Sequence, residues 1–321
     1  MRKYRGLALG ASVFALVISA CTAGGSSQSP SQSAAAQKPK VTVGSADFYE
    51  STLVAEMYAQ ALEAKGYTVE RKLVLGARKL TNDALKNGQL NLMPEYIGSD
   101  ARELKAEATG DPQVTAANLK KALEPLGLTL LDVAPGQDQN GFVVRQETAT
   151  KYKLKTLTDL AAVTDPLKWG LPPECKTNPS CHQALLDSYG IDTNKLADAK
   201  PSLVVSLKPC SAPMATALNT RNPDGSYAVD VAELCTTQPA IQQFNFVLLE
   251  DDKHSQPVDN MAPVVRKDLL DAAPPDFAET LNAISAKLTT DDLTALGVEI
   301  VGNHKTEADV AKKWLTDNGL I

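Results

Sequence analysis

The sequence lacks any run of basic residues. Its 321 residues include 32 Lys and Arg against 38 Asp and Glu, which gives a formal net charge of −6 at pH 7. Proteins that bind nucleic acids neutralise phosphates with clustered Lys and Arg, so we expect no nucleic-acid partner. Beyond the N-terminal segment, no apolar stretch is long enough to span a bilayer.

The sequence also lacks a recognisable catalytic pattern. It has no GxSxG and no phosphate-loop spacing, and His182, His254 and His304 are scattered without a Cys/His or Ser/His/Asp arrangement. We therefore expect no enzyme, no cofactor and no metal. One alternative is an enzyme that uses Asp47 and Glu50 as acid–base groups, and turnover of a bound ligand would reveal it. Another is a structural surface protein, which would show no ligand-dependent change of shape.

The N-terminus carries an export signal. Arg2, Lys3 and Arg5 precede the apolar run LALGASVFALVIS, so residues 1–20 are predicted to be a signal peptide. The following sequence ISAC resembles the lipobox of bacterial lipoproteins, which implies cleavage before Cys21 and its lipidation, with palmitate as one acyl chain. Residues 21–40 form a Ser/Gly/Ala/Gln-rich tether. Loss of three basic residues takes the net charge from −6 to −9 (−6 − 3).

Four further cysteines indicate disulfides. Outside the cytoplasm, Cys175, Cys181, Cys210 and Cys235 suggest two bonds, and three pairings are possible. We favour Cys175–Cys181, which share the loop PPECKTNPSC, and Cys210–Cys235. A zinc site with His182 is the alternative, but Cys-x5-Cys-His lacks the usual short spacing, and zinc requires reduced thiols.

Hydrophobic periodicity predicts alternating strands and helices, and hence mostly parallel sheets flanked by helices. Expected strands are 40–44, 68–75, 89–93, 128–134, 141–145, 203–207, 227–231 and 244–249; expected helices are 50–65, 79–86, 158–162 (N-cap Thr158), 275–288, 291–296 and 307–318. The order suggests two lobes, one of residues 41–143 plus 245–321 and the other of residues 144–244. A hinge is expected near residues 141–145 and 245–249.

A weak internal repeat points to one functional place. Segments 84–96 and 217–235 both run from Ala-Leu through a turn into an apolar–Asn/Asp–apolar strand, so that Tyr96 falls opposite Cys235. Parallel sheets bind ligands beyond the carboxyl ends of their strands. We therefore expect both strand ends, with residues 45–48 and 76–78, to line one cleft.

Several segments together resemble the glycine betaine/choline-type osmoprotectant-binding proteins of ABC importers: VTVGSADFYESTLVAEMYAQALEAKGY, LGARKLTNDALKNGQLNLMPEYIGSD, GLPPEC and LLEDDKHSQPVDNMAPVVRKDLL. The resemblance implies an α/β, two-lobed periplasmic-binding-protein fold of type II that closes around one small ligand. It also implies an ABC permease and ATPase as partners, a monomer, and a cage of aromatic rings that includes Tyr96. The expected ligand-contacting residues are Ala46, Asp47, Phe48, Glu50, Arg78, Tyr96, Asn140, Glu174, Cys235, Thr236, Thr237 and Gln256.

The sequence departs from the family at two other cage positions. Cys235 stands in LCTTQ where the second repeat usually carries an aromatic residue, and KHSQPVDN replaces a stretch usually rich in rings, which places Ser255, Gln256 and Val258 or Asp259 there. Two ligand classes follow. One is a quaternary ammonium osmoprotectant, with Phe48 or Tyr49 rebuilding the cage; the other is a hydroxylated or aromatic molecule held by the new polar groups.

Overall fold

The computed structural model describes residues 38–208 and 210–321. The expected signal peptide, the lipidation site Cys21 and most of the expected tether lie outside the described residues. Within the described ranges, no helix combines the length and the apolar character needed to cross a bilayer.

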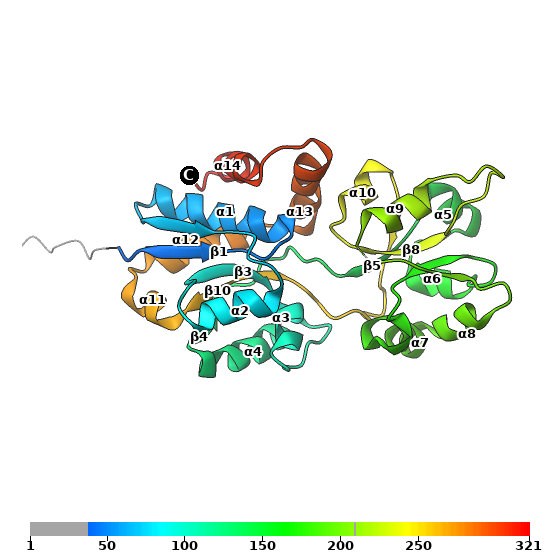
Figure 1. The fold of residues 1–321 in the computed structure, drawn as a ribbon, viewed down its shortest axis with the longest axis horizontal. Helices are drawn as coiled ribbons and strands as arrows, with labels where there is room; N and C mark the ends of the chain where they lie inside the picture. The colour runs from blue at the N-terminus through cyan, green and yellow to red at the C-terminus, as the bar shows by residue number, and fades with distance from the viewer. Residues whose placement is uncertain (1–37, 209) are drawn as a thin grey trace, which may run out of the picture. The chain divides into compact units, whose positions relative to one another are not determined.

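The first sheet has five strands in the order β2-β1-β3-β10-β4 (Figure 1). Strands β1 and β2 and strands β1 and β3 pair in parallel, whereas β10 is antiparallel to both β3 and β4. Four of the five strands therefore point the same way, as expected for a mostly parallel sheet. The bounds are β1 Val41–Gly44, β2 Val69–Lys72, β3 Leu92–Tyr96, β4 Leu128–Leu130 and β10 Met261–Arg266.

Helices cover both faces of this sheet. One apolar cluster joins Val41, Val43 and Leu92 to helices α1, α12, α13 and α14, and a second joins Met93 and Val264 to α2, α3 and α4. Alternate strand residues thus enter opposite clusters, as the period of two requires. The bounds are α1 Tyr49–Ala64, α2 Arg78–Lys86, α3 Ile97–Glu103, α4 Pro112–Leu123, η1 Glu124–Leu126, α11 Lys267–Ala272, α12 Asp276–Ser285, α13 Thr290–Gly297, η4 Val298–Gly302 and α14 Glu307–Asp317.

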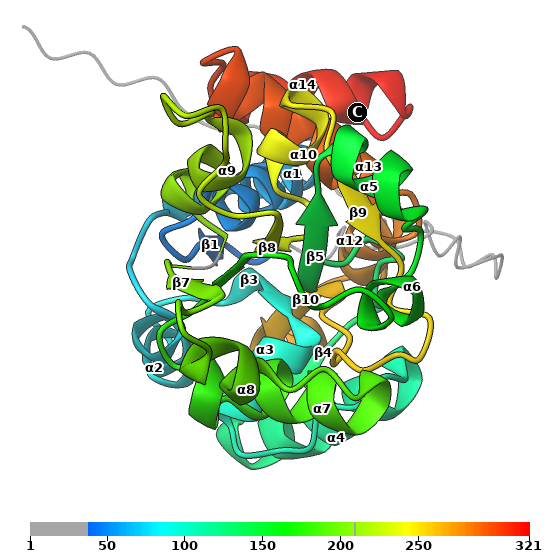
Figure 2. The same cartoon turned by 90° about the vertical axis from the view of Figure 1, so that its right-hand side faces the viewer.

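The second sheet repeats the topology of the first, with the order β7-β6-β8-β5-β9 and with β5 as its one antiparallel strand. Figure 2 shows α9 and α10 on one side of it and α7 and α8 on the other. The bounds are β5 Asn140–Val144, α5 Gln146–Tyr152, α6 Leu157–Ala161, β6 Trp169–Leu171, η2 Cys175–Thr177, η3 Pro179–Gln183, α7 Ala184–Tyr189, α8 Thr193–Asp198, β7 Val204–Ser206, α9 Ala212–Asn219, β8 Val231–Cys235, α10 Pro239–Gln243 and β9 Val247–Leu249.

The sheets place the lobe boundaries elsewhere than the sequence did. Strands β5 and β9 both belong to the second sheet, whereas the predicted boundaries cut β5 after residue 143 and assign β9 to the first lobe. The expected hinge strands are therefore parts of one sheet. Because β5 lies between β8 and β9 and pairs with both, the chain crosses between the sheets in segments 131–139 and 250–260.

Two local predictions were wrong, and two strands were missed. The expected strand at 227–231 begins only at Val231, because Asp230 turns aside to bind Arg145, with 2.7 Å between Oδ1 and Nη2. Helix α6 is capped by Thr156, not Thr158, since the Thr156 hydroxyl accepts from the Asp159 N–H in a capping box. The Thr158 hydroxyl instead donates to Asp252 Oδ2 at 2.6 Å. Strands β6 and β10 were not predicted.

Candidate ligand-binding cleft

A cavity of about 700 Å³ receives residues from both lobes and from both crossing segments. Tyr96, the last residue of β3, and Cys235, the last residue of β8, both line it. The two equivalent strand ends therefore meet at one cavity, as the repeat predicted. The cavity lies at the carboxyl ends of parallel strands, where the helices that follow leave their first backbone N–H groups free of intrahelical partners.

Most of the expected ligand-contacting residues reach this cavity, and the others do not. Those that line it are Phe48, Glu50, Arg78, Tyr96, Asn140, Cys235, Thr237 and Gln256. Ala46 is buried behind it with its N–H bonded to Ser51 Oγ. Asp47 and Glu174 are exposed away from it. The Thr236 hydroxyl accepts from the Gln139 N–H at 3.0 Å and so faces the crossing segment.

Four aromatic rings line the cavity. Phe48 lies just before α1 and stacks on Tyr96, with ring centroids 6.0 Å apart and an interplanar angle of 18°. Tyr49 and Phe244 also line it, the latter directly after α10. The sequence counted Tyr96 as the one ring kept from the family pattern. Phe48 and Tyr49, which the sequence offered as replacement rings, both reach the cavity, and the structure adds Phe244, which the sequence did not single out.

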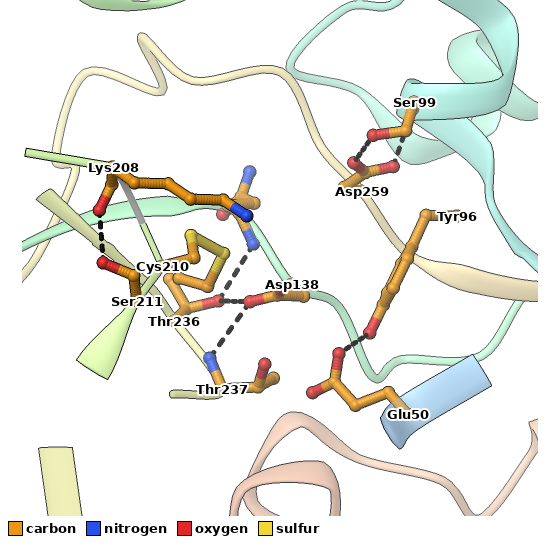
Figure 3. Close-up of a disulfide and its surroundings, with 12 residues drawn as sticks. Glu50, Tyr96, Ser99, Asp138, Lys208, Cys210, Ser211, Thr236, Thr237 and Asp259 are labelled. Atoms are coloured by element: carbon orange, nitrogen blue, oxygen red, sulfur yellow. Dashed lines mark hydrogen bonds between the residues drawn. A yellow bond between two sulfur atoms is a disulfide. The ribbon is translucent and has the colours of Figure 1, made fainter. Parts of the chain in front are cut away.

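Three carboxyl groups line the same cavity, those of Glu50, Asp138 and Asp259. The hydroxyl of Tyr96 donates to Glu50 Oε2 at 2.5 Å (Figure 3). The hydroxyl of Tyr49 donates to Glu50 Oε1 at 3.0 Å. Asp138 Oδ1 accepts from the Thr237 N–H at 3.1 Å. Burial raises the pKa of Glu50, and burial together with the negative charge of Glu50 raises the pKa of Asp138 well above its usual range. Burial likewise raises the pKa of Tyr96, so its hydroxyl stays a neutral donor.

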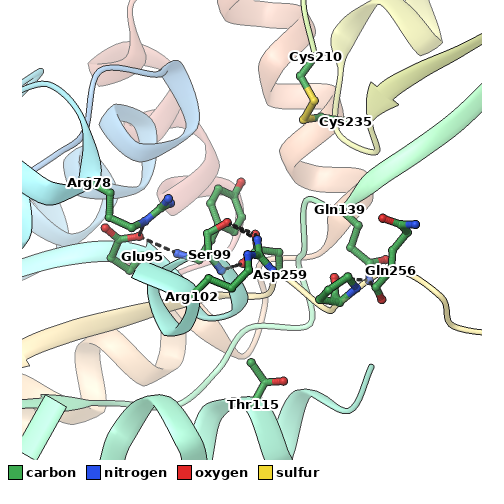
Figure 4. Close-up of polar contacts among 12 residues, drawn as sticks. Arg78, Glu95, Ser99, Arg102, Thr115, Gln139, Cys210, Cys235, Gln256 and Asp259 are labelled. Carbon is green, nitrogen blue, oxygen red and sulfur yellow. Dashed lines mark hydrogen bonds and ion pairs between the residues drawn. A yellow bond between two sulfur atoms is a disulfide. The ribbon is translucent and has the colours of Figure 1, made fainter. Parts of the chain in front are cut away.

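Two guanidinium groups lie along the part of the cavity that the first lobe contributes (Figure 4). Arg78 Nε donates to Glu95 Oε2 at 2.9 Å, and Arg102 Nη2 donates to Ser99 Oγ at 3.0 Å and lies 3.6 Å from Asp259 Oδ2. Glu95 is almost fully buried, and burial raises its pKa to about 7 against the opposing charge of Arg78. The remaining guanidinium N–H groups are suited to binding a carboxylate.

Sequence reasoning missed Ser99, Arg102, Asp138 and Gln139, which all line the cavity. Ser99 and Arg102 lie in α3, which starts directly after the strand end at Tyr96. Asp138 and Gln139 lie in the crossing segment just before β5. The signal that could have found the first two is a helix starting at a predicted strand end. The second two depended on knowing where the chain crosses between lobes.

Both expected disulfides are present. Cys175–Cys181 has a Cα–Cα distance of 5.1 Å, and Cys210–Cys235 one of 4.9 Å. The second bond ties the loop before α9 to the end of β8 at the cavity wall (Figure 3). The zinc alternative fails because its two thiols are bonded to each other. His182 instead contacts Thr193 Oγ1 through Nδ1 at 2.8 Å and Asn194 Nδ2 through Nε2 at 3.0 Å.

Comparison with known proteins agrees with this geometry. Residues 39–317 match the family model described as the substrate binding domain of ABC-type glycine betaine transport systems. The carnitine transport binding protein OpuCC of Listeria monocytogenes is 27% identical over 286 residues, which cover 88% of this chain and 87% of that protein. The glycine betaine-binding protein YehZ of Escherichia coli is 27% identical over 289 residues, 87% of this chain and 90% of that protein.

A solved structure shares the fold. The crystal structure described as a glycine betaine/carnitine/choline ABC transporter superposes with a TM-score of 0.76 at 24% identity and covers 87% of this chain and 99% of that one. Both sheets, with helices on their faces, are thus those of two-lobed periplasmic substrate-binding proteins. The chain belongs to the family of extracytoplasmic substrate-binding proteins of ABC-type glycine betaine importers, and it is a solute-binding protein, not an enzyme.

Proposed function

We propose that this protein binds a small zwitterionic quaternary ammonium solute, a betaine, between its lobes and delivers it to an ABC permease. The observation that carries this proposal is the joint presence of rings, carboxyl groups and guanidinium groups at one cavity of about 700 Å³. A trimethylammonium group has no hydrogen-bond donor and is stabilised by ring faces and negative charge. A carboxylate is stabilised by guanidinium N–H groups.

The arrangement gives the two ends of such a ligand different partners. Phe48 and Tyr96 form a stacked pair, and the carboxylate of Glu50 lies at the hydroxyl of Tyr96. Arg78 and Arg102 supply the positive charge that a carboxylate requires. Relatives named for carnitine and for glycine betaine support the same class, because both solutes carry a trimethylammonium group and a carboxylate.

A thermal-shift screen of the mature protein tests the ligand class. We expect glycine betaine and carnitine to raise the melting temperature, and choline, which lacks a carboxylate, to raise it less. The variant Arg78→Gln should reduce the difference between the melting-temperature shifts caused by betaine and by choline. Arg78 is proposed to bind the ligand carboxylate, which choline lacks. Stabilisation by hydroxylated aromatic molecules, with none by any quaternary amine, would instead favour ligands held by Thr237 and Gln256.

We further propose that the mature protein is held at the outer face of the membrane by a lipid on Cys21. The support is the ISAC sequence after an export signal and the Ser/Gly-rich residues that follow. Mass spectrometry of the mature N-terminus checks this directly. The variant Cys21→Ser should leave the membrane fraction and keep its ligand affinity; retention in the membrane would show that another segment anchors it.

A further inference from the structure

We propose that the cation of the ligand takes the place of a proton held by the carboxyl pair of Glu50 and Asp138, so that ligand binding releases about one proton. This inference rests on the proposed function, because it requires a ligand that carries a positive charge. The carboxyl groups of Glu50 and Asp138 would then be the groups that make the cleft prefer cations.

The pair is built into the cavity from two different parts of the chain. Glu50 lies in the first turn of α1, and Asp138 lies in the crossing segment that leads into β5. Both line the cavity. Each carboxyl group is oriented by neutral donors. The hydroxyl of Tyr96 donates to Glu50 and the Thr237 N–H donates to Asp138 (Figure 3), and the hydroxyl of Tyr49 also donates to Glu50. These hydrogen bonds therefore hold the two carboxyl groups, and any negative charge on them, at defined positions in the cavity.

No cation balances this charge within residues 38–208 and 210–321, where neither Glu50 nor Asp138 takes part in an ion pair. The two guanidinium groups of the same cavity are paired with other acids: Arg78 with Glu95 of the first lobe, and Arg102 with Asp259 of the crossing segment 250–260. The remaining titratable groups that face the pair are the two tyrosine hydroxyls, which are neutral, and Asp259, which adds negative charge near Asp138.

An empty cleft of this kind keeps a proton. Burial raises the pKa of Glu50, and burial and the charge of Glu50 raise the pKa of Asp138. Two like charges in one poorly solvated place do not both ionise readily. The pair therefore favours a state that holds a proton over one in which both carboxyl groups are ionised.

A bound trimethylammonium group changes this balance. Its charge cannot be donated or removed, and next to the pair it favours the ionised form of both carboxyl groups. The proton leaves to the buffer, and the ligand cation remains against two carboxylates. Linkage then fixes the sign: because the bound state holds fewer protons, affinity rises with pH, at most about tenfold per unit while one proton is released.

The test is isothermal titration calorimetry of the mature protein with glycine betaine near pH 7 in two buffers of different ionisation enthalpy, phosphate and Tris. The difference between the observed enthalpies gives the number of protons released. We expect a value between about 0.5 and 1, and a value near zero in Asp138→Asn. Glu50→Gln provides a second variant should Asp138→Asn fail to fold.

Two control variants separate the pair from other buried acids. Glu95 has a pKa of about 7 and lies behind Arg78, where a ligand carboxylate would bind, so Glu95→Gln should keep the proton release if it comes from the pair. Glu233 is buried in the second lobe away from the cavity, and Glu233→Gln should not change the count.

Each outcome has one reading. Binding of glycine betaine with no proton released overturns the inference and leaves the proposed function intact. Release that persists unchanged in Asp138→Asn and Glu50→Gln, or that disappears in Glu95→Gln, also overturns it. Absence of binding by every quaternary amine overturns the proposed function instead.

Discussion

The two lobes share a topology but use the same position differently. In each sheet the middle strand ends at the cavity: β3 ends in Tyr96 and β8 ends in Cys235. Tyr96 presents a ring and a hydroxyl that bonds to Glu50, whereas Cys235 is bonded covalently to Cys210. The end of β3 therefore offers groups that can contact a ligand, whereas the end of β8 is held in place at the cavity wall by a disulfide.

The buried acids of these strands differ in the same way. Glu95 in β3 pairs with Arg78, which itself lines the cavity. Glu233 in β8 is 1% exposed, lies 3.3 Å from Cys181 Sγ, and has no ion-pair partner among the described residues. In the first lobe the buried acid thus contacts a residue that lines the cleft. In the second lobe the buried acid lies in the core, away from the cleft. This difference teaches that a shared fold fixes where strands end but not what their side chains do.

The largest expected effect concerns the disulfide Cys210–Cys235 in the second lobe. Replacing Cys210 and Cys235 with Ser together removes a bridge across 25 residues, and we expect a loss of about 3 kcal/mol in the free energy of unfolding. The Cys175→Ser/Cys181→Ser variant, which opens a separation of 6, should lose about 2 kcal/mol. Denaturant unfolding measures both. Only the first variant should also weaken ligand binding; equal binding by both would show that the cavity wall needs no staple.

The next effect is a pH dependence in the second lobe. Burial raises the pKa of Glu233 to about 8 from 4.5, so the folded state holds a proton that the unfolded state has lost. Stability therefore falls as pH rises from about 4.5 to 8, and Glu233→Gln should remove this loss. We expect the variant to gain about 2 kcal/mol at pH 8 and nothing at pH 4.5, measured by thermal unfolding at both pH values.

The matched variant in the first lobe should behave differently. Glu95→Gln removes the partner of Arg78 and so leaves a mostly buried guanidinium without its carboxylate. It should therefore not stabilise the protein at pH 8. A gain as large as that of Glu233→Gln would remove the contrast between the two buried acids.

A smaller effect is expected at the ring. Tyr96→Ala should weaken betaine binding at least tenfold, about 1.4 kcal/mol, because it removes the ring stacked on Phe48. Tyr96→Phe keeps the ring but loses the bond to Glu50, and its loss of affinity should be smaller. Calorimetric titration checks both, with circular dichroism as a control of folding. Normal binding by Tyr96→Ala would assign the ring to core packing.

For the last pair of variants we expect the same small loss of unfolding free energy in both lobes. Thr156 in the second lobe and Thr289 in the first each cap a helix through a capping box with Asp159 and Asp292. Thr156→Ala and Thr289→Ala should each lose about 1 kcal/mol of unfolding free energy, since the same bonds disappear. Denaturant unfolding that finds very unequal losses would show that the two lobes do not unfold as one cooperative unit.

Some parts of the site could be predicted from residues alone. Tyr96 and Cys235 were placed together because two similar segments end at equivalent positions. Phe48 and Arg78 were found because they follow predicted strands, and Glu50 was named through the resemblance to the family. Asp138 and Arg102 were missed because their part in the cavity depends on the crossing segments and on α3, for which hydrophobic periodicity gives no signal.

The sequence by itself determined the alternating order of strands and helices, the favoured cysteine pairing and the family, because periodicity, compartment and ordered motifs are local properties of the chain. Only the tertiary structure decided that β5 and β9 complete the second sheet, that four rings meet at the cavity, and that Glu50 faces the same space as Asp138. The physical reason is that sheet pairing and the desolvation of charge depend on residues far apart in the chain, whose proximity folding alone creates.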